Sequence, residues 1–498
     1  MVGTYGITLP FPFPANFASE KLKNEKMEDK KQKNDKGMSR REMLKWLGAG
    51  TAAAAAGAYG WRLAVSGGKD GYSTAGVMPE VIPTDRMTYR TDPHTGRKVS
   101  LLGYGLMRLP VKEGANPNSN EVDQDMVNKL VDYAMAHGIN YFDTAHPYHK
   151  GMSQIAIGKA LKKYPRDSFF LATKMPTPLM PTLEQAKEIF EKQLKDCQVE
   201  YFDYYLLHTL QTLDVYQEIY EKRGILAYLQ EQKRRGRIRS LGFSFHGTRP
   251  LMNHLLDCGV KWDFVQIQCN YHDWERGSEL PAWAQQEERV PAQWLYERLT
   301  ERGIPITVME PLLGGRLVRL NHRAISILKQ AAPERSTASW ALRFVGSLPN
   351  ILCVLSGMTY MENLQDNICT FSPFQPLSDG EREVLDEALD AFLSNRTVPC
   401  TGCQYCTPCP YGVDIPAVFA HYNKCVNEER MPKDKMDKDY VRERRNFLIG
   451  YDRSVPELQQ ANRCIQCGQC LRKCPQSINI PKEMGKIDRF VEQLKLEK

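Results

Sequence analysis

The chain has 498 residues, of which 42% are hydrophobic and 25% are charged, and its formal net charge is +7. This length and balance are typical of a soluble globular protein with one large domain and a smaller one. Basic residues are spread along the chain and no nucleic-acid-binding motif is present, so we exclude a nucleic acid partner.

The N-terminal region is predicted to be unfolded and then to carry an export signal. Residues 1–37 are rich in lysine and lack apolar periodicity, which is typical of a disordered extension. In residues 38–65, Arg40 and Arg41 precede a weakly apolar stretch, an arrangement that resembles a twin-arginine signal. A membrane span needs about 20 strongly apolar residues, so we expect no stable span. We predict export to the periplasm, and the alternative is membrane anchoring by an uncleaved signal.

The middle of the chain alternates short β-branched or aromatic runs with longer helical patterns. The predicted strands are Val99–Met107, Ile139–Phe142, Phe169–Thr173, Tyr204–Leu207, Ile238–Phe243, Phe264–Gln268, Pro305–Met309 and Ile351–Ser356. The predicted helices include Thr182–Cys197, Val215–Arg235 and Met361–Cys369, and the first of them opens with a capping box of Thr182 and Gln185. Eight such units predict an α/β fold, a (β/α)8 TIM barrel over residues 85–375.

Four residues of catalytic type follow these strands, at the end of the barrel where TIM-barrel active sites lie. Asp143 and Tyr148 follow the second strand, Lys174 the third and His208 the fourth. A tyrosine has an ordinary pKa of about 10, and a nearby ammonium favours its phenolate. We expect Asp143 to hold Lys174 charged. His208 would orient a carbonyl oxygen that Tyr148 protonates while hydride arrives.

These residues resemble the aldo/keto reductase family over roughly residues 98–370. The positions that carry the resemblance are the run Gly138–Ala145 (GINYFDTA), Tyr148, Lys174 and His208. It implies that Tyr148 is the general acid, that Asp143 and Lys174 tune it, and that His208 orients the substrate. It also implies a small carbonyl or alcohol substrate and a nicotinamide cofactor, NAD(H) or NADP(H), lying extended across the barrel mouth.

The resemblance further implies a set of cofactor-binding residues: Gly105, Met107, Ser244, His246, Gln266, Asn270, Gly357, Asp366 and Asn367. Phe245 replaces the Asn of the family's Ser-Asn pair, and we expect His246 to take over its hydrogen bonds. The family often places Lys and Arg on the 2′-phosphate of NADP where this chain has Gly357 and Asn363. Because such phosphate contacts are charge-assisted, we predict that NADH is favoured or that nicotinamide binds weakly.

A helix predicted at Leu377–Leu393, with Ser378 as its N-cap, connects the barrel to residues 397–498 and lies in a linker of residues 376–396. Two cysteine runs follow: Cys400, Cys403, Cys406 and Cys409, then Cys464, Cys467, Cys470 and Cys474. The second run ends in Pro475 and has the C-x2-C-x2-C-x3-C-P spacing of bacterial ferredoxins, which bind [4Fe–4S] clusters. The last gap of the first run is one residue shorter.

A cubane cluster needs four thiolates, and in two-cluster ferredoxins each run supplies three ligands to one cluster and a fourth to the other. We therefore predict two [4Fe–4S] clusters in a small α-helical, ferredoxin-like domain, with Cys474 completing the first set and Cys409 the second. Cys425 is an alternative to Cys409. Zinc sites and a disulfide framework are the alternatives to clusters. The twin-arginine route carries folded proteins, which suits clusters assembled before export.

The whole layout resembles aldo/keto reductases fused to an iron–sulfur domain. It predicts a nicotinamide-dependent oxidoreductase coupled to its clusters, with a redox protein as a further partner. The alternatives are an electron-transfer protein whose barrel is a docking scaffold, and a redox-neutral isomerase with structural clusters. Hydride transfer moves two electrons at once and a cluster passes one. The sequence offers no route between the two halves.

Overall fold

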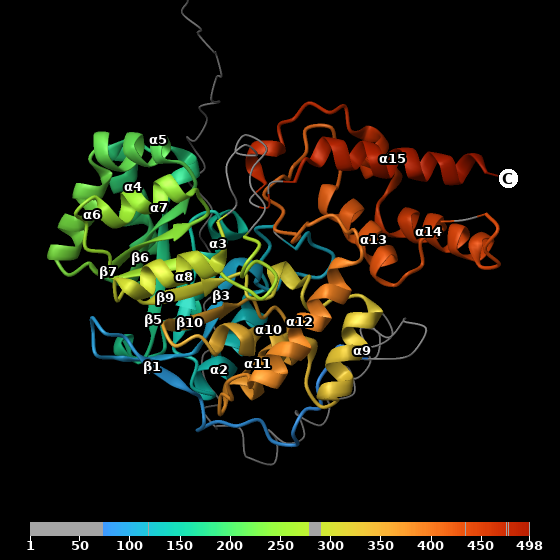
Figure 1. The fold of residues 1–498 in the computed structure, drawn as a ribbon. Coiled ribbons are helices and arrows are strands. Elements are labelled where there is room, and N and C mark those ends of the chain that lie inside the picture. Colours follow the sequence, from blue (N-terminus) through green and yellow to red (C-terminus); the bar gives the residue numbers. More distant parts are fainter. Residues whose placement is uncertain are drawn as a thin grey trace, which may run out of the picture. The chain divides into compact units, whose positions relative to one another are not determined.

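The computed structural model describes residues 73–497 apart from 118, 278–289, 434, 475 and 477. The predicted extension, the export signal and Pro475 lie outside the described residues. A closed barrel of parallel strands in the order β10-β3-β4-β5-β6-β7-β8-β9 forms the larger part, so the predicted TIM barrel is confirmed (Figure 1). Its strands are β3 (Leu102–Gly105), β4 (Tyr141–Asp143), β5 (Phe170–Pro176), β6 (Phe202–Leu210), β7 (Ile238–Phe245), β8 (Phe264–Gln268), β9 (Ile306–Met309) and β10 (Ile351–Ser356).

The strand register brings the predicted catalytic residues to one rim. Gly105 pairs with Asp143 between β3 and β4, and Pro176 pairs with His208 between β5 and β6. Because all eight strands are parallel, their C-terminal ends meet at this rim. The strands are almost wholly buried, as expected for a parallel sheet covered by helices on its outer face.

The first predicted strand, Val99–Met107, was wrong as a single element. It divides into β2 (Lys98–Ser100), which pairs antiparallel with β1 (Tyr89–Thr91), and the barrel strand β3. The division falls at Leu101, whose N–H donates to the carbonyl of Thr88 while its own carbonyl accepts from Val354 of β10. A continuous apolar run cannot reveal this change of hydrogen-bonding partner.

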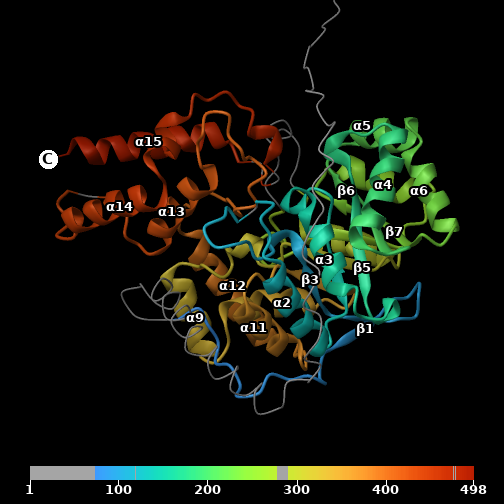
Figure 2. The same ribbon diagram turned by 180° about the vertical axis from the view of Figure 1, so that it is seen from behind.

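Helices cover the barrel strands (Figures 1 and 2). They are α2 (Gln124–Ala136), α3 (Met152–Leu161), α4 (Leu183–Cys197), α5 (Leu213–Tyr216), α6 (Ile225–Arg234), α7 (Arg249–Asp257), α8 (Ala292–Glu301), α9 (His322–Ala331), α10 (Thr337–Gly346) and α11 (Met361–Phe371). The capping box of Thr182 and Gln185 at α4 is confirmed. The predicted helix Val215–Arg235 was wrong as one helix. A π-helical turn follows α5, and Gly224, in a left-handed conformation with φ 73°, separates that turn from α6.

The connecting helix is α12 (Asp379–Leu393), capped by Ser378 and Glu381 as a second capping box. Its buried residues belong to the barrel core, so this helix extends the barrel. The C-terminal part contains α13 (Ile415–Asn427), α14 (Tyr440–Ser454) and α15 (Ile480–Leu496), with a hydrophobic core of its own (Figure 2). In the described residues, no helix is both long and apolar enough to cross a membrane.

Candidate active site and cluster sites

The rim of the barrel holds a buried ion pair. Asp143 ends β4 and Lys174 lies in the neighbouring strand β5, so both side chains reach the same point. The Nζ atom of Lys174 donates to Oδ1 of Asp143 at 2.5 Å and to the carbonyl of Thr144 at 2.8 Å, and the lysine side chain is 1% exposed. Burial lowers the pKa of Lys174, while the charge of Asp143 acts in the opposite direction.

Tyr148 lies beside this pair. It begins a short helical turn in which His149 and Lys150 have positive φ angles, a conformation that turns the chain sharply after β4. The Lys174 ammonium lies 5.1 Å from the centre of the Tyr148 ring, and the His208 ring lies edge-on at 6.0 Å. Asp143, Tyr148, Lys174 and His208, all predicted from the sequence, therefore meet at one place.

The electrostatic environment of Tyr148 differs from the expectation. Burial raises the pKa of Tyr148 well above its ordinary value, and Tyr405, Asp143 and Glu310 raise it further. Lys174, whose ammonium hydrogen bonds to Asp143 and Thr144, is not among the charges that shift the pKa of the protonated tyrosine most. Tyr148 consequently keeps its proton through the neutral pH range, which suits a proton donor.

His208 provides the other polar group that faces a ligand. Burial, followed by the charge of Lys174, lowers the pKa of His208 well below its ordinary value, so the imidazole is neutral. Its side chain is buried, and its Nδ1 atom has no hydrogen-bond partner among the described residues. A buried polar atom without a partner is costly, and a bound substrate oxygen or water would satisfy it.

The residues predicted at the nicotinamide end surround this site. Gln266 donates to Oδ2 of Asp143 at 3.2 Å, and the hydroxyl of Ser244 accepts from the N–H of Thr209 at 2.7 Å. Burial lowers the pKa of His246 to about 4, so its ring is neutral. Gln266 therefore contacts a predicted catalytic residue directly, and Ser244 lies one strand away from His208 at the backbone of Thr209. Asn270 differs, because its amide donates to Asp273 and to the carbonyl of Glu310.

The remaining predicted cofactor residues form hydrogen bonds within the chain. Asp366 accepts from Ser336 at 2.7 Å, and Asn367 donates to Ser356 at 2.9 Å. A Cβ built on Gly76 would lie 3.4 Å from Oδ1 of Asp366, so the segment before β1 passes close to this carboxylate. In this conformation the Asp366 end of the predicted cofactor site is closed by contacts within the chain.

Gly105, Met107 and Gly357 lie at the same rim. Gly105 ends β3, and Met107 lies in the turn Leu106–Arg108 that follows it. A Cβ on Gly357 would lie 3.7 Å from the Arg108 side chain. An arginine therefore passes over the position where the family pattern would place a lysine.

Three further residues near the site were missed by the sequence reasoning: Arg108, Glu310 and Tyr405. Glu310 directly follows β9 and has a positive φ of 55°. Burial raises the pKa of Glu310, and Arg108 opposes that shift. A carboxylate at a strand end was a signal available from the sequence. Tyr405 comes from the first cysteine run, and no local pattern placed it beside a barrel residue.

The first cysteine run is attached to the barrel rim. Arg108 donates to the carbonyl of Thr401 at 2.7 Å. A Cβ on Gly314, whose φ is +63°, would lie 2.3 Å from Cβ of Thr401, so only glycine permits this approach. Tyr405 is close enough to Glu310, Arg108 and Asp143 for their charges to change its pKa, which is raised mainly by burial.

Four thiols converge beside this attachment, and we call them the inner set: Cys400, Cys403, Cys406 and Cys474. Burial raises the pKa of Cys400 to about 11 and that of Cys403 to about 12, and in both cases the neighbouring Cys474 raises it further. Burial also raises the pKa of Cys406, with Cys403, Cys400, Cys474 and Cys470 as further causes. The fourth thiol therefore comes from the second run.

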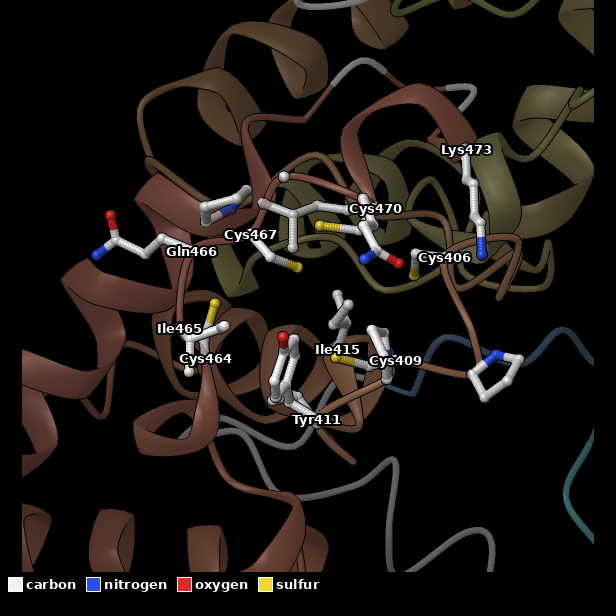
Figure 3. Close-up of a pocket in the computed structure, with 17 residues that line it drawn as sticks. Cys406, Cys409, Tyr411, Ile415, Cys464, Ile465, Gln466, Cys467, Cys470 and Lys473 are labelled. Atoms are coloured by element: carbon white, nitrogen blue, oxygen red, sulfur yellow. The ribbon is translucent and has the colours of Figure 1, made fainter. Parts of the chain in front are cut away.

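The other four thiols, the outer set, are Cys409, Cys464, Cys467 and Cys470. Burial raises the pKa of Cys470 to about 11, and Cys464, Cys409 and Cys467 add to the shift. Figure 3 shows these sulfur atoms around a shared small cavity, which Tyr411, Ile415 and Ile465 also line. Cys406 of the inner set also lines this cavity, so the two sets adjoin each other, and the crosswise division of the ligands stays a prediction.

The donor sets fit clusters better than the alternatives. Among the described residues, no cysteine forms a disulfide, which disfavours a disulfide framework. Within the described ranges, no three potential ligands converge tightly enough for a single metal ion, whereas a four-iron cube holds its thiolates farther apart. Cys425 lies on α13 with His421 at 3.7 Å, among Glu428 and Lys424, and belongs to neither set.

Comparisons with known proteins agree with this geometry. Residues 101–390, more than half of the chain, match the model of the aldo/keto reductase family, and residues 399–479 match that of the 4Fe-4S dicluster domain. The chain therefore belongs to the aldo/keto reductase family and is an oxidoreductase with a C-terminal 4Fe-4S domain.

Relatives are similar mainly over the barrel. An uncharacterized oxidoreductase, YqkF, of Bacillus subtilis is 26% identical, covering 53% of this chain and 88% of its own. An NADH-specific methylglyoxal reductase of Escherichia coli is 24% identical, and the match covers 59% of this chain and 96% of that relative. A probable aldo-keto reductase 1 of Glycine max is 33% identical, and the match spans 30% of this chain and 42% of that relative. A solved aldo-keto reductase from Bacillus halodurans has a TM-score of 0.48 at 22% identity, covering 61% of this chain and 97% of its own.

Proposed function

We propose that this protein interconverts a small carbonyl compound and its alcohol at Tyr148, and exchanges the electrons of that reaction through two [4Fe–4S] clusters. The observation that supports it best is the contact between the two parts. The Thr401 loop of the inner thiol set packs on Arg108 and Gly314 at the rim where Asp143 and Lys174 lie.

The barrel residues would act on the oxygen of the substrate. The carbonyl oxygen accepts hydrogen bonds from the hydroxyl of Tyr148 and from the neutral ring of His208. A nicotinamide, when bound, supplies the hydride that the carbonyl carbon receives. Tyr148 transfers its proton to the oxygen, and the Lys174 ammonium, 5.1 Å from the ring, stabilises the phenolate that remains. Asp143 holds that ammonium in place.

The preferred nicotinamide would be NADH. Gly357 and Asn363 supply no cation for a 2′-phosphate, and the nearby Arg108 is bonded to Thr401. The similarity to an NADH-specific methylglyoxal reductase agrees, and it makes methylglyoxal a first substrate to assay. Binding of both nucleotides should be measured by fluorescence titration. A clear preference for NADPH would contradict this part of the proposal.

The clusters match the reaction in electron number. Oxidation of one alcohol to a carbonyl releases two electrons and two protons. Each cluster, when bound, would accept one electron, so the two together could hold both electrons, and the two protons would pass to solvent. The inner set, next to the rim, would exchange with the barrel, and the outer set with a redox partner.

The deciding experiment compares Tyr148→Phe with the wild type after anaerobic purification. Turnover of the carbonyl substrate should collapse while nicotinamide binding, iron content and the EPR signals of the reduced clusters persist. If the barrel were only a docking scaffold, electron transfer to external carriers would continue and no carbonyl turnover would be found in either protein. If the reaction were a redox-neutral isomerisation, turnover would leave the cluster oxidation state unchanged.

We also propose that the chain is exported by the twin-arginine route, on the basis of Arg40 and Arg41. Replacing both with lysine should keep the protein in the cytoplasm, as measured by cell fractionation. A periplasmic location of the double variant would contradict the proposal.

A further inference from the structure

We infer that the outer thiol set opens onto a docking surface for an acidic, one-electron carrier protein. This inference rests on the proposed electron transfer through the clusters, and it adds the place where electrons enter or leave the molecule and the charge of the partner.

The two thiol sets differ in their surroundings. The inner set is next to Thr401, which is 3% exposed and packs on Gly314 of the barrel. In the outer set, Cys467 is exposed, and the cavity between the thiols opens to solvent. A carrier protein that must approach a cluster closely could therefore reach the outer set directly.

Apolar side chains surround this opening. Tyr411 is 45% exposed and Ile465 is 60% exposed, and both line the cavity (Figure 3). The backbone of Leu458, a residue that is 68% exposed, is close by, since a Cβ on Gly412 would lie 3.5 Å from its carbonyl oxygen. Exposed apolar groups gathered around a functional opening are typical of an interaction site.

Cations flank the apolar patch. Lys473 lines the cavity, and Lys482 and Arg489 line an adjoining open hollow that shares Gln466 with it. Within the described part of the chain, these three cations form no ion pair. Of the nearby carboxylates, Asp488 adjoins Arg489 on α15, and Arg489 opposes the rise in the pKa of Asp488 that burial causes. Glu483 pairs with Lys486 at 3.6 Å, and Glu457 is exposed beside Leu458.

The unpaired cations identify the occupant by charge. Acidic side chains on the partner would form ion pairs with Lys473, Lys482 and Arg489. An apolar area at the centre of the partner's surface would cover Ile465 and Tyr411. Complementary charge around an apolar centre chiefly raises the rate of association and sets orientation. In each encounter that reduces the protein, the carrier loses one electron and the outer cluster gains it, and two encounters supply one two-electron reaction.

The test uses the full-length protein with both clusters. A photoreduced acidic [2Fe–2S] ferredoxin is mixed with the oxidised protein, and bleaching of the clusters is followed by stopped flow at several salt concentrations. The triple variant Lys473→Glu, Lys482→Glu, Arg489→Glu should react at least about tenfold more slowly at low salt and lose most of its salt dependence. The matched control Lys159→Glu, Lys187→Glu, Lys195→Glu, on α3 and α4, should react like the wild type.

Two measurements keep the outcomes separate. Dithionite should reduce the clusters of the triple variant as fast as those of the wild type, and iron analysis should be unchanged. If the triple variant loses iron, the Gln versions of the same substitutions replace it. An unchanged ferredoxin rate with intact clusters overturns the docking surface. The docking surface is also overturned if the triple variant loses binding to vesicles of anionic phosphatidylglycerol but keeps its rate of reduction by ferredoxin. If dithionite itself cannot reduce the clusters, the proposed electron transfer fails instead.

Discussion

The barrel site and the cysteine domain hold their functional groups in opposite ways. At the barrel rim, Lys174 and Asp143 are bonded to each other at 2.5 Å within a large core. In the C-terminal domain, thiols surround a cavity next to a much smaller core. The first site is complete within the chain, whereas the second depends on the group that fills it. A small core gives little stability of its own, so the clusters should support that domain.

The largest expected effect follows from removing a cluster ligand. Cys474→Ser takes the fourth thiol from the inner set and Cys409→Ser takes it from the outer set. Either variant should lower the iron content from about eight to about four atoms per chain, because each cubane holds four. Cys425→Ser is the control and should keep all the iron. Loss of iron in the control, with none in the other two, would contradict the assignment.

Breaking the ion pair should be the next largest effect, and it should affect the barrel alone. Lys174→Met leaves Asp143 buried without a counter-charge, and such changes cost about 3–5 kcal/mol. Thermal unfolding of the barrel should occur at a clearly lower temperature, with turnover lost and cluster EPR signals retained in the folded protein. An unchanged unfolding temperature would show that Asp143 is not dependent on Lys174.

Tyr148→Phe should separate chemistry from stability. Removal of the phenolic proton should reduce turnover by about 10²–10⁴-fold, the usual contribution of general acid catalysis. Because the ion pair of Lys174 does not use the hydroxyl, the unfolding temperature should change little. For the wild type, the raised pKa of Tyr148 predicts that carbonyl reduction stays level through neutral pH and declines only at alkaline pH. A decline beginning near neutrality would contradict the environment described.

The contact between the barrel and the first cysteine run can be disrupted by substituting Gly314. Gly314→Ala places a methyl group 2.3 Å from Cβ of Thr401 and should move the cysteine loop away from the rim. Gly236→Ala is a matched control, because Gly236 has a similar φ of +75° and nothing near its missing Cβ. We expect electron exchange between nicotinamide and the clusters to slow in the first variant only. Equal rates in both would mean that the contact is not on the path.

The smallest effect concerns the connecting helix. Arg343 lowers the pKa of Glu381 to about 2. The contribution of this carboxylate to stability is therefore fully present above its ordinary pKa of 4.5 and is lost as the pH falls from there toward 2. Glu381→Gln should lower the unfolding temperature slightly at pH 7, and the difference from the wild type should narrow at acid pH. A difference in unfolding temperature between the variant and the wild type that increases as the pH falls would contradict the lowered pKa of Glu381.

The sequence predicted what depends on local pattern and on spacing. Strand–helix alternation predicted the barrel, strand ends predicted the neighbouring positions of Asp143, Lys174 and His208, and the cysteine runs predicted the 4Fe-4S domain. It failed where tertiary contacts decide. The change of partner at Leu101 and the break at Gly224 interrupt otherwise continuous patterns. Tyr405 lies near Glu310 at the rim although the two residues are nearly 100 positions apart in the chain, and no local sequence pattern predicts this contact.

The most direct measurement of the central claim, that barrel and clusters form one electron path, is the addition of saturating NADH to the oxidised, cluster-containing protein without oxygen. One NADH gives up two electrons and a proton, and the two clusters can take one electron each. We predict that NADH bleaches the cluster absorbance and produces the EPR signals that dithionite produces. Clusters that dithionite reduces but NADH leaves oxidised, in a protein that still turns over a carbonyl with NADH, would contradict the account.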